Sequence, residues 1–104
     1  MIRIECRTHN GEWCGFEVSG HAGTARAGRD TVCAAVSSAV YMAANTVTEV
    51  VTAPADIVEQ DGYLSLTVTD KVAACQTVLA GFRLHMQALQ SQYPTRIHLT
   101  ITEV

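Results

Sequence analysis

The sequence predicts a two-layer α/β (α+β) fold, with two helices packed on one face of a mostly antiparallel sheet in the order ββαββαβ. Short stretches in which apolar and polar residues alternate are typical of strands that bury one face. Two longer stretches repeat apolar residues every three or four positions, as amphipathic helices do. Because the polar face of such strands must meet water, we expect both helices on the other face.

The first two strands form a hairpin whose register follows from the side-chain pattern. A two-residue turn at Asn10-Gly11 would set Arg7 opposite Cys14 and charges opposite apolar residues. A three-residue loop from His9 to Gly11 avoids this, with Gly11 in the left-handed conformation that such loops require. The expected pairs are Cys6 with Cys14, Ile4 with Phe16, Ile2 with Val18 and, on the wet face, Arg3 with Glu17.

The first helix is expected to begin at Asp30, since aspartate is a favoured N-cap residue, and to end before Pro54. Its expected core stripe is Val32, Val36, Val40, Ala43, Val47 and Val50. From residue 31 to residue 55 the only charged residue is Glu49. Serine, asparagine and threonine residues within the stretch argue against a membrane span, so we expect a second copy of the chain, in a homodimer, to help cover this helix.

The remaining elements are a second hairpin, a second helix and a final strand. Asp61-Gly62 is a strong turn signal between two apolar stretches. Asp70 is expected to cap the second helix, and Tyr93-Pro94 to end it. The expected core stripe of this helix is Val72, Cys75, Leu79, Phe82, Met86 and Leu89. The apolar residues of the final strand are Ile97, Leu99 and Ile101.

Composition narrows the class of protein. The 104 residues predict a single domain spanning 1–104, with 48% hydrophobic and 16% charged residues. The formal net charge is −3 and the seven lysine and arginine residues are scattered, so we expect no direct nucleic-acid partner. The chain starts with an alternating strand rather than a signal peptide, which predicts a cytoplasmic protein whose four cysteines are reduced.

A histidine precedes a glycine-containing loop and a cysteine follows it. His21 follows the second strand, and Cys33 falls three positions after the expected cap Asp30, in the first helical turn. Backbone N–H groups there lack intrahelical partners, and the helix dipole favours a thiolate. The same N–H groups are candidates to receive the oxyanion of a tetrahedral intermediate. The pattern indicates a nucleophilic thiol with His21 as general base.

The same segment resembles a known family. Gly20-His21-Ala22, followed by Gly-Arg-Asp-Thr-Val-Cys-Ala-Ala-Val-Ser at 28–37, is similar to the pattern of the bacterial ribosomal-processing cysteine proteases, and the resemblance covers essentially the whole chain. It implies a dimeric cysteine endopeptidase with a catalytic dyad of His21 and Cys33. Its implied substrate is the N-terminal extension of large-subunit ribosomal protein number twenty-seven. Thr31 departs from the pattern, where an aliphatic residue is expected.

Other residues of the segment have possible supporting roles. Asp30 either orients the imidazole of His21 or only caps the helix, and Ser37 lies on the same side of the helix as Cys33. Arg26 and Arg29 raise the local positive potential, unless they are ordinary solvated arginines. The expected substrate loop comprises Gly20, Ala22, Gly23, Arg26, Gly28 and Arg29.

Alternatives to proteolysis remain open from the residues alone. A non-catalytic, ribosome-associated binding module would carry Cys33 as a structural residue, and a thiol redox sensor would need a resolving cysteine nearby. Cys6 and Cys14 are expected to face each other and to cross-link only under oxidation. Together with His9 they lack a fourth ligand at suitable spacing, so no metal and no cofactor are expected.

Overall fold

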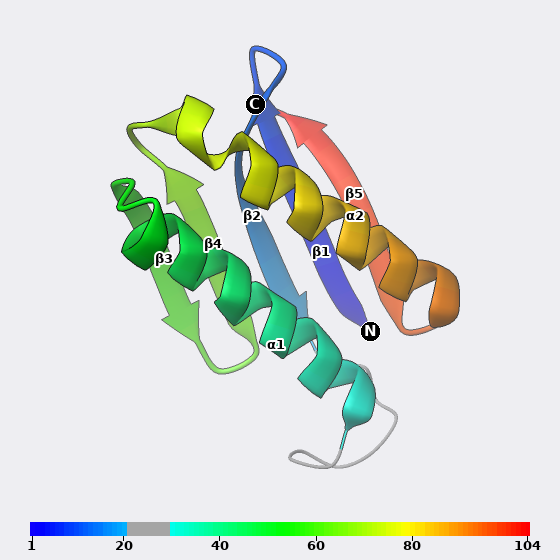
Figure 1. The fold of residues 1–104 in the computed structure, drawn as a ribbon. Coiled ribbons are helices and arrows are strands. Elements are labelled where there is room, and N and C mark those ends of the chain that lie inside the picture. The colour runs from blue at the N-terminus through cyan, green and yellow to red at the C-terminus, as the bar shows by residue number, and fades with distance from the viewer. Residues whose placement is uncertain (21–29) are drawn as a thin grey trace.

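A computed structural model describes residues 1–20 and 30–104 of the chain. Within them the chain forms a mixed sheet of five strands, covered on one face by two helices (Figure 1). The order ββαββαβ and the two-layer α+β class agree with the prediction from sequence. The elements are β1 (Ile2–His9), β2 (Glu12–Gly20), α1 (Thr31–Asn45), β3 (Ala55–Gln60), β4 (Tyr63–Val68), α2 (Gln76–Gln92) and β5 (Ile97–Glu103).

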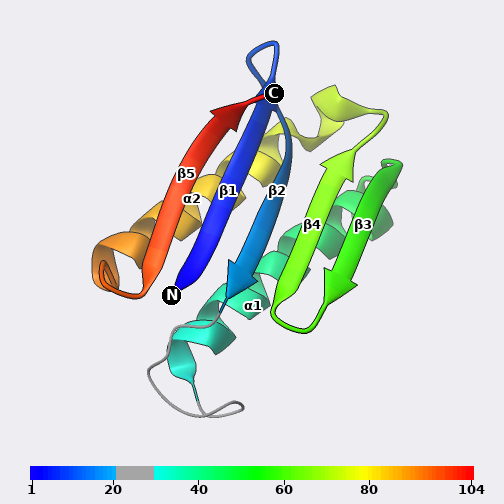
Figure 2. The same cartoon turned by 180° about the vertical axis from the view of Figure 1, so that it is seen from behind.

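The strands lie in the order β3-β4-β2-β1-β5. Neighbouring strands are antiparallel except at one edge, where β5 runs parallel to β1. Figure 2 shows the sheet from behind, with both helices on its far side and no element over the near face. The expectation that both helices share one face of the sheet is therefore confirmed.

The register of the first hairpin differs from the prediction. The turn has two residues, Asn10 and Gly11, with φ angles of 51° and 78°. The observed pairs are Cys6 with Phe16, Ile4 with Val18, Ile2 with Gly20, Glu5 with Glu17 and Arg3 with Ser19. The predicted three-residue loop and its pairs, Arg3 with Glu17 among them, are wrong.

A β-bulge explains the difference. Arg7 pairs with Gly15 and Thr8 with Trp13, so Cys14 is an extra residue on β2. This insertion restores the side-chain alternation that a two-residue turn alone would have reversed. Cys14 is therefore not opposite Cys6, and its thiol instead donates to the carbonyl oxygen of Arg7 at 3.5 Å. The expected facing cysteine pair does not form.

Helix α1 buries most of its predicted stripe, with one exception. Val32, Val36, Val40, Ala43 and Val47 are buried, together with Ala39 and Ala44, but Val50 is 76% exposed. After Asn45 the backbone widens into a π-helical turn, Thr46–Val50, in which the N–H of Val51 donates to the carbonyl oxygen of Thr46 at 2.8 Å. The extra residue per turn rotates Val50 away from the sheet.

Helix α2 begins later than predicted. Asp70 accepts a hydrogen bond from the N–H of Lys71 at 2.8 Å, and Lys71 has a φ of 58°, so Asp70 does not cap α2. A short 3₁₀ turn, Val72–Cys75, leads into the helix. The predicted stripe is confirmed in burial: Cys75, Leu79, Phe82, Met86 and Leu89 are buried, and Val72 is half-buried against them. The helix ends at Gln92, just before Tyr93-Pro94 as predicted.

The segment Thr31–Val50 is long and apolar enough to cross a membrane by length and composition, and 39% of its most apolar window is buried inside the fold. The buried side of α1 belongs to the same hydrophobic core as the inner face of the sheet. A core helix of a folded domain meets the same criterion, so the segment is weak support for a membrane span.

Gly15→Ala adds a methyl group to β2 and tests how closely the backbones of β2 and β4 approach each other. A Cβ there would lie 2.2 Å from the carbonyl oxygen of Leu66, which is backbone and cannot move aside cheaply. We expect Gly15→Ala to lower the free energy of unfolding by about 1–3 kcal/mol, measured by urea unfolding. Gly81→Ala is the matched control, because nothing lies within 4 Å of its added Cβ. It should leave stability unchanged or raise it by up to ~1 kcal/mol. Equal midpoints for Gly15→Ala and the native chain would contradict this packing.

Candidate active site

Cys33 lies in the first turn of α1, as predicted. Asp30 precedes the helix with an extended backbone, and its Oδ1 accepts hydrogen bonds from the N–H of Val32 at 3.0 Å and of Cys33 at 3.1 Å. The carboxylate is buried, so the helix start is fixed in place. The prediction that Asp30 is the N-cap is confirmed. A role for Asp30 in orienting His21 stays a prediction.

The Asp30 cap occupies backbone N–H groups that the sequence had suggested as donors to an oxyanion. The N–H groups of Val32 and Cys33 already donate to Asp30, and the N–H of Ala34 donates to the Asp30 carbonyl oxygen at 3.0 Å. These groups are therefore not the unoccupied donors that the sequence suggested. An oxyanion formed at Cys33 must displace the Asp30 carboxylate from them or use other donors.

Cys33 differs from the other cysteines in accessibility. It is half-buried, whereas Cys6, Cys14 and Cys75 are buried. Burial raises the pKa of the Cys6 thiol to about 11, and burial is also the main cause that raises the pKa of Cys14 and of Cys75 above the ordinary value. These three thiols stay protonated at neutral pH and pack as core or near-core residues. Cys33 is the thiol that a reagent or substrate can reach.

Gly20, the first residue of the predicted substrate loop, ends β2 at the side of the sheet where α1 begins (Figures 1 and 2). Its φ is 91°, and a Cβ on it would lie 2.3 Å from the carbonyl oxygen of Met1. Its N–H donates to the carbonyl oxygen of Gly62, in the β3–β4 turn, at 3.0 Å. Only glycine fits this position, which fixes where the chain leaves the sheet towards His21.

The other loop residues of the predicted site, together with its general base, lie outside the described residues. They are His21, Ala22, Gly23, Arg26, Gly28 and Arg29. Contact between His21 and Cys33 therefore stays a prediction, as do the roles of the two arginines.

The β3–β4 hairpin borders α1, which the sequence did not indicate. Ser37 is exposed one turn beyond Cys33, and Tyr41 lies one turn further along the helix. The Tyr41 hydroxyl donates to the Glu59 carboxylate of β3 at 3.1 Å, which raises the pKa of that phenol. Gly62 touches the start of the loop from the same hairpin. These contacts join segments far apart in the chain, so no local motif could have predicted them.

The described part of the site can perform thiol chemistry. A thiolate at Cys33 would lie at the positive end of the α1 dipole, which stabilises an anion. Within residues 1–20 and 30–104, no group of three or more histidine, cysteine, aspartate or glutamate side chains is placed to hold a metal ion. The arrangement supplies a nucleophile and a defined helix start, and the predicted general base, His21, lies outside the described residues.

Comparison with known proteins agrees with this chemistry. The model of a family described as cysteine protease Prp matches residues 1–98. The fold is similar to the ribosomal processing protease Prp from S. aureus with a covalently linked product peptide, with a TM-score of 0.89, 23% identity, and coverage of 97% of this chain and 99% of that one. The same S. aureus protease with a substrate peptide gives a TM-score of 0.84 at 22% identity, with the same coverage.

A protein from Streptococcus mutans, SMU.848, is similar at a TM-score of 0.81 and 24% identity, covering 100% of this chain and 96% of that one. No curated protein matches the sequence. At these identities the solved structures show a shared fold, and the family match over most of the chain shows the family.

The cap of α1 can be tested by separating the charge of Asp30 from its hydrogen bonds. We expect Asp30→Ala to lower the free energy of unfolding by about 0.5–2 kcal/mol, because two backbone N–H groups lose their acceptor. Asp30→Asn keeps an oxygen in place and should lose much less. Urea unfolding of the two variants measures the difference, and equal losses would contradict the capping role.

Accessibility predicts selective alkylation. Iodoacetamide at pH 7 should modify the folded protein once, at Cys33, because the other three thiols are buried and two of them lie in the hydrophobic core. Peptide mapping by mass spectrometry locates the label. Cys33→Ala should show no fast labelling until urea unfolds it. Fast labelling of Cys6 or Cys75 in the folded state would contradict the packing described.

Proposed function

The chain belongs to the cysteine protease Prp family, and from this premise we propose that it removes the N-terminal extension of large-subunit ribosomal protein number twenty-seven. That it is a cysteine protease of a ribosomal-processing family follows from the match over residues 1–98. The observation that supports Cys33 as its nucleophile is its position: the one cysteine of the chain that is not buried lies at the N-terminus of α1.

In the proposed reaction, Cys33 and His21 act as a dyad. His21 takes the proton of the Cys33 thiol, and the sulfur attacks the carbonyl carbon of the scissile peptide bond. The carbon–nitrogen bond breaks, the leaving amine receives the proton from His21, and the acyl group stays on Cys33 as a thioester. Water, deprotonated by His21, then hydrolyses the thioester and releases the peptide with a new carboxyl terminus.

The proposed substrate is an extended polypeptide tail. The S. aureus relatives were solved with a substrate peptide and with a covalently linked product peptide, which supports a peptide as the partner here. We propose that residues 20–29 form the loop that borders this tail, with Gly20 as its fixed start. Family membership favours this reading over a non-catalytic binding module with a structural Cys33.

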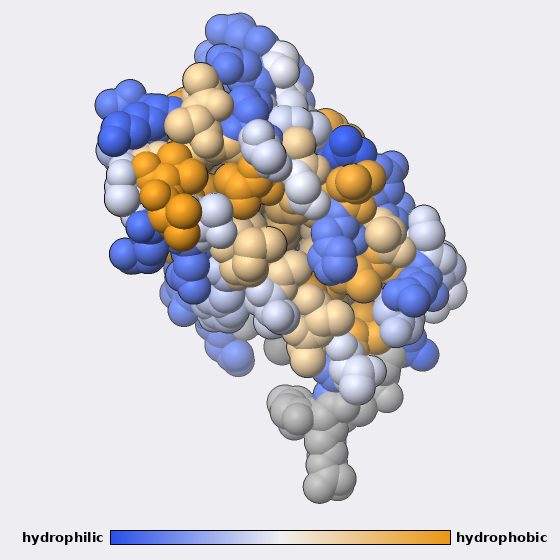
Figure 3. Space-filling view, in the orientation of Figure 1, coloured by the Kyte–Doolittle hydropathy of each residue, from blue (hydrophilic) through white to orange (hydrophobic). Residues whose placement is uncertain are grey.

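We also propose that the protein acts as a homodimer in the cytoplasm. Figure 3 shows apolar surface on the face that carries the two helices. Large apolar side chains on or just after α1 are exposed: Tyr41 at 48%, Met42 at 59% and Val50 at 76%. Exposed apolar side chains gathered along one helix are a feature of protein–protein contacts, and a second copy would cover them.

Peptide cleavage tests the proposed function. A peptide copying the extended N-terminus of the host's ribosomal protein should be cut at one bond, measured by mass spectrometry. Cys33→Ala should abolish cutting, and His21→Ala should lower the rate by roughly 10²-fold or more, since general base catalysis contributes about that much. Ser38→Ala, at an exposed position of α1 outside the predicted site, is the control and should cut at nearly the native rate.

Two other outcomes would contradict different parts of the proposal. An uncut peptide with rapid alkylation of Cys33 would leave the thiol active but the proposed substrate wrong. Full activity in His21→Ala would make the dyad wrong while leaving the protease assignment intact.

A further inference from the structure

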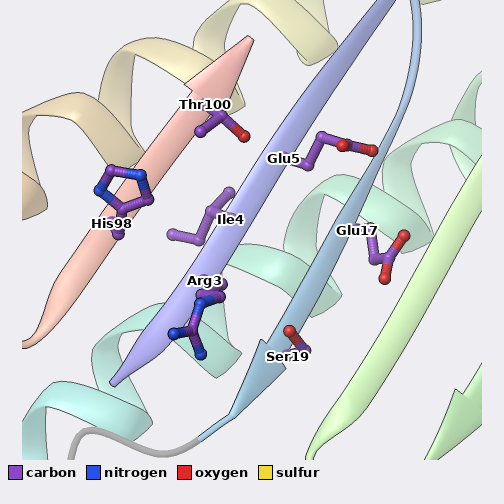
Figure 4. A pocket seen from close by; sticks show the side chains of 7 residues that line it. All are labelled: Arg3, Ile4, Glu5, Glu17, Ser19, His98 and Thr100. Atoms are coloured by element: carbon purple, nitrogen blue, oxygen red, sulfur yellow. The ribbon is translucent and has the colours of Figure 1, made fainter. Parts of the chain in front are cut away.

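The uncovered face of the sheet carries a row of hydrogen-bond donors unrelated to Cys33. In the strand register, Arg3 of β1 pairs with Ser19 of β2 on one side and with His98 of β5 on the other. Figure 4 shows these three side chains on adjacent strands, projecting from the side of the sheet that lies away from the helices. Neighbouring strands lie about 4.8 Å apart, so the three polar groups can reach one small ligand placed over Arg3.

This row lines a hollow. Ser19, Arg3 and His98 border it at one end, and Glu5, Glu17 and Thr100 lie beside them in the next row (Figure 4). The hollow has a volume of about 200 Å³. One water occupies roughly 30 Å³ in the liquid, so the hollow can hold a group of several heavy atoms.

On this face some charged side chains form ion pairs and, within the described part of the chain, Arg3 does not. Arg7 donates through Nε to Glu5 and through a terminal nitrogen to Glu17, which holds both carboxylates in one ion-pair cluster. Among residues 1–20 and 30–104, the side chains of Arg3, Ser19 and His98 make no hydrogen bond or ion pair. The guanidinium of Arg3 is therefore available to a ligand, with a hydroxyl on one side and an imidazole on the other.

We propose that the row formed by Ser19, Arg3 and His98, the Arg3 row, binds a carboxylate of a polypeptide. The planar guanidinium presents two parallel N–H groups that match the two oxygens of a carboxylate. The Ser19 hydroxyl and a ring N–H of His98 can each donate to the same oxygens. Arg7 pairs with the two glutamates of the hollow, which leaves the Arg3 guanidinium as the cation of the row. A single guanidinium suits a monoanionic carboxylate better than a phosphate dianion.

The Arg3 row is separate from the proposed active site. Cys33 is on α1, which covers the opposite face of the sheet (Figures 1 and 2). The row is therefore a second contact point, for the carboxyl terminus of a bound polypeptide. It does not depend on the proposed function, and its test requires no cleavage.

Titration with two matched peptides tests the proposal. N-acetyl-alanyl-alanine carries a free carboxylate, and its amide is identical except for that charge. Backbone amide shifts of the full-length protein, followed by NMR, should change around residues 3, 19 and 98 with the acid, and the amide should bind at least about fivefold more weakly. Inorganic phosphate is the third probe and should bind more weakly than the peptide acid.

Variants separate the Arg3 row from general electrostatics. Arg3→Gln should weaken binding of the peptide acid at least about fivefold, and His98→Gln should weaken it to a smaller degree. Lys71→Gln removes the same charge from an exposed turn on another part of the chain and should bind like the native protein. Among the described residues the exposed Arg3 side chain makes no hydrogen bond or ion pair, so urea unfolding of Arg3→Gln should match the native chain. Equal loss in Arg3→Gln and Lys71→Gln, equal binding of acid and amide, or tighter binding of phosphate would overturn the proposal.

Discussion

The burial of one sheet face beneath α1 and α2 is the constraint on which the rest of the structure depends. Phe16 of β2 is fully buried and stacks on Phe82 of α2, with ring centroids 4.3 Å apart and planes at 28°. Val36 and Val40 bury the inner side of α1 in the same core. Because burial of apolar surface is the main favourable term in folding, α1 cannot rotate about its axis without a large loss. The direction of Cys33, at the border of this buried side, is thereby set by residues that take no part in chemistry.

What the sequence predicted well depends on local signals. An aspartate before a run of small and apolar residues marks a helix start, and that alone places Cys33 in the first turn. The apolar stripes of both helices follow the helical repeat, and the two Gly-containing turns fall where glycine is needed. Each of these features depends on residues a few positions apart, which a single sequence displays directly.

What the sequence missed depends on compensation between distant or irregular segments. The bulge at Cys14 corrects an alternation that a two-residue turn would break, and side-chain parity alone cannot distinguish this from a longer loop. The π-helical turn after Asn45 rotates Val50 out of the buried stripe, and no residue type in the sequence predicts such a turn. Two N–H groups of the first turn are occupied because the Asp30 side chain that marks the helix start is also their acceptor.

The pairing of β5 with β1 joins the two ends of the chain. Ile2 lies opposite Ile97, and the N–H of Val104 donates to the carbonyl oxygen of Thr8 at 2.8 Å. β1 is made well before β5, and contacts between such distant segments close slowly. During translation one edge of β1 has no partner until β5 has left the ribosome. A protease of a ribosomal-processing family therefore completes this sheet only after β5 has been synthesised.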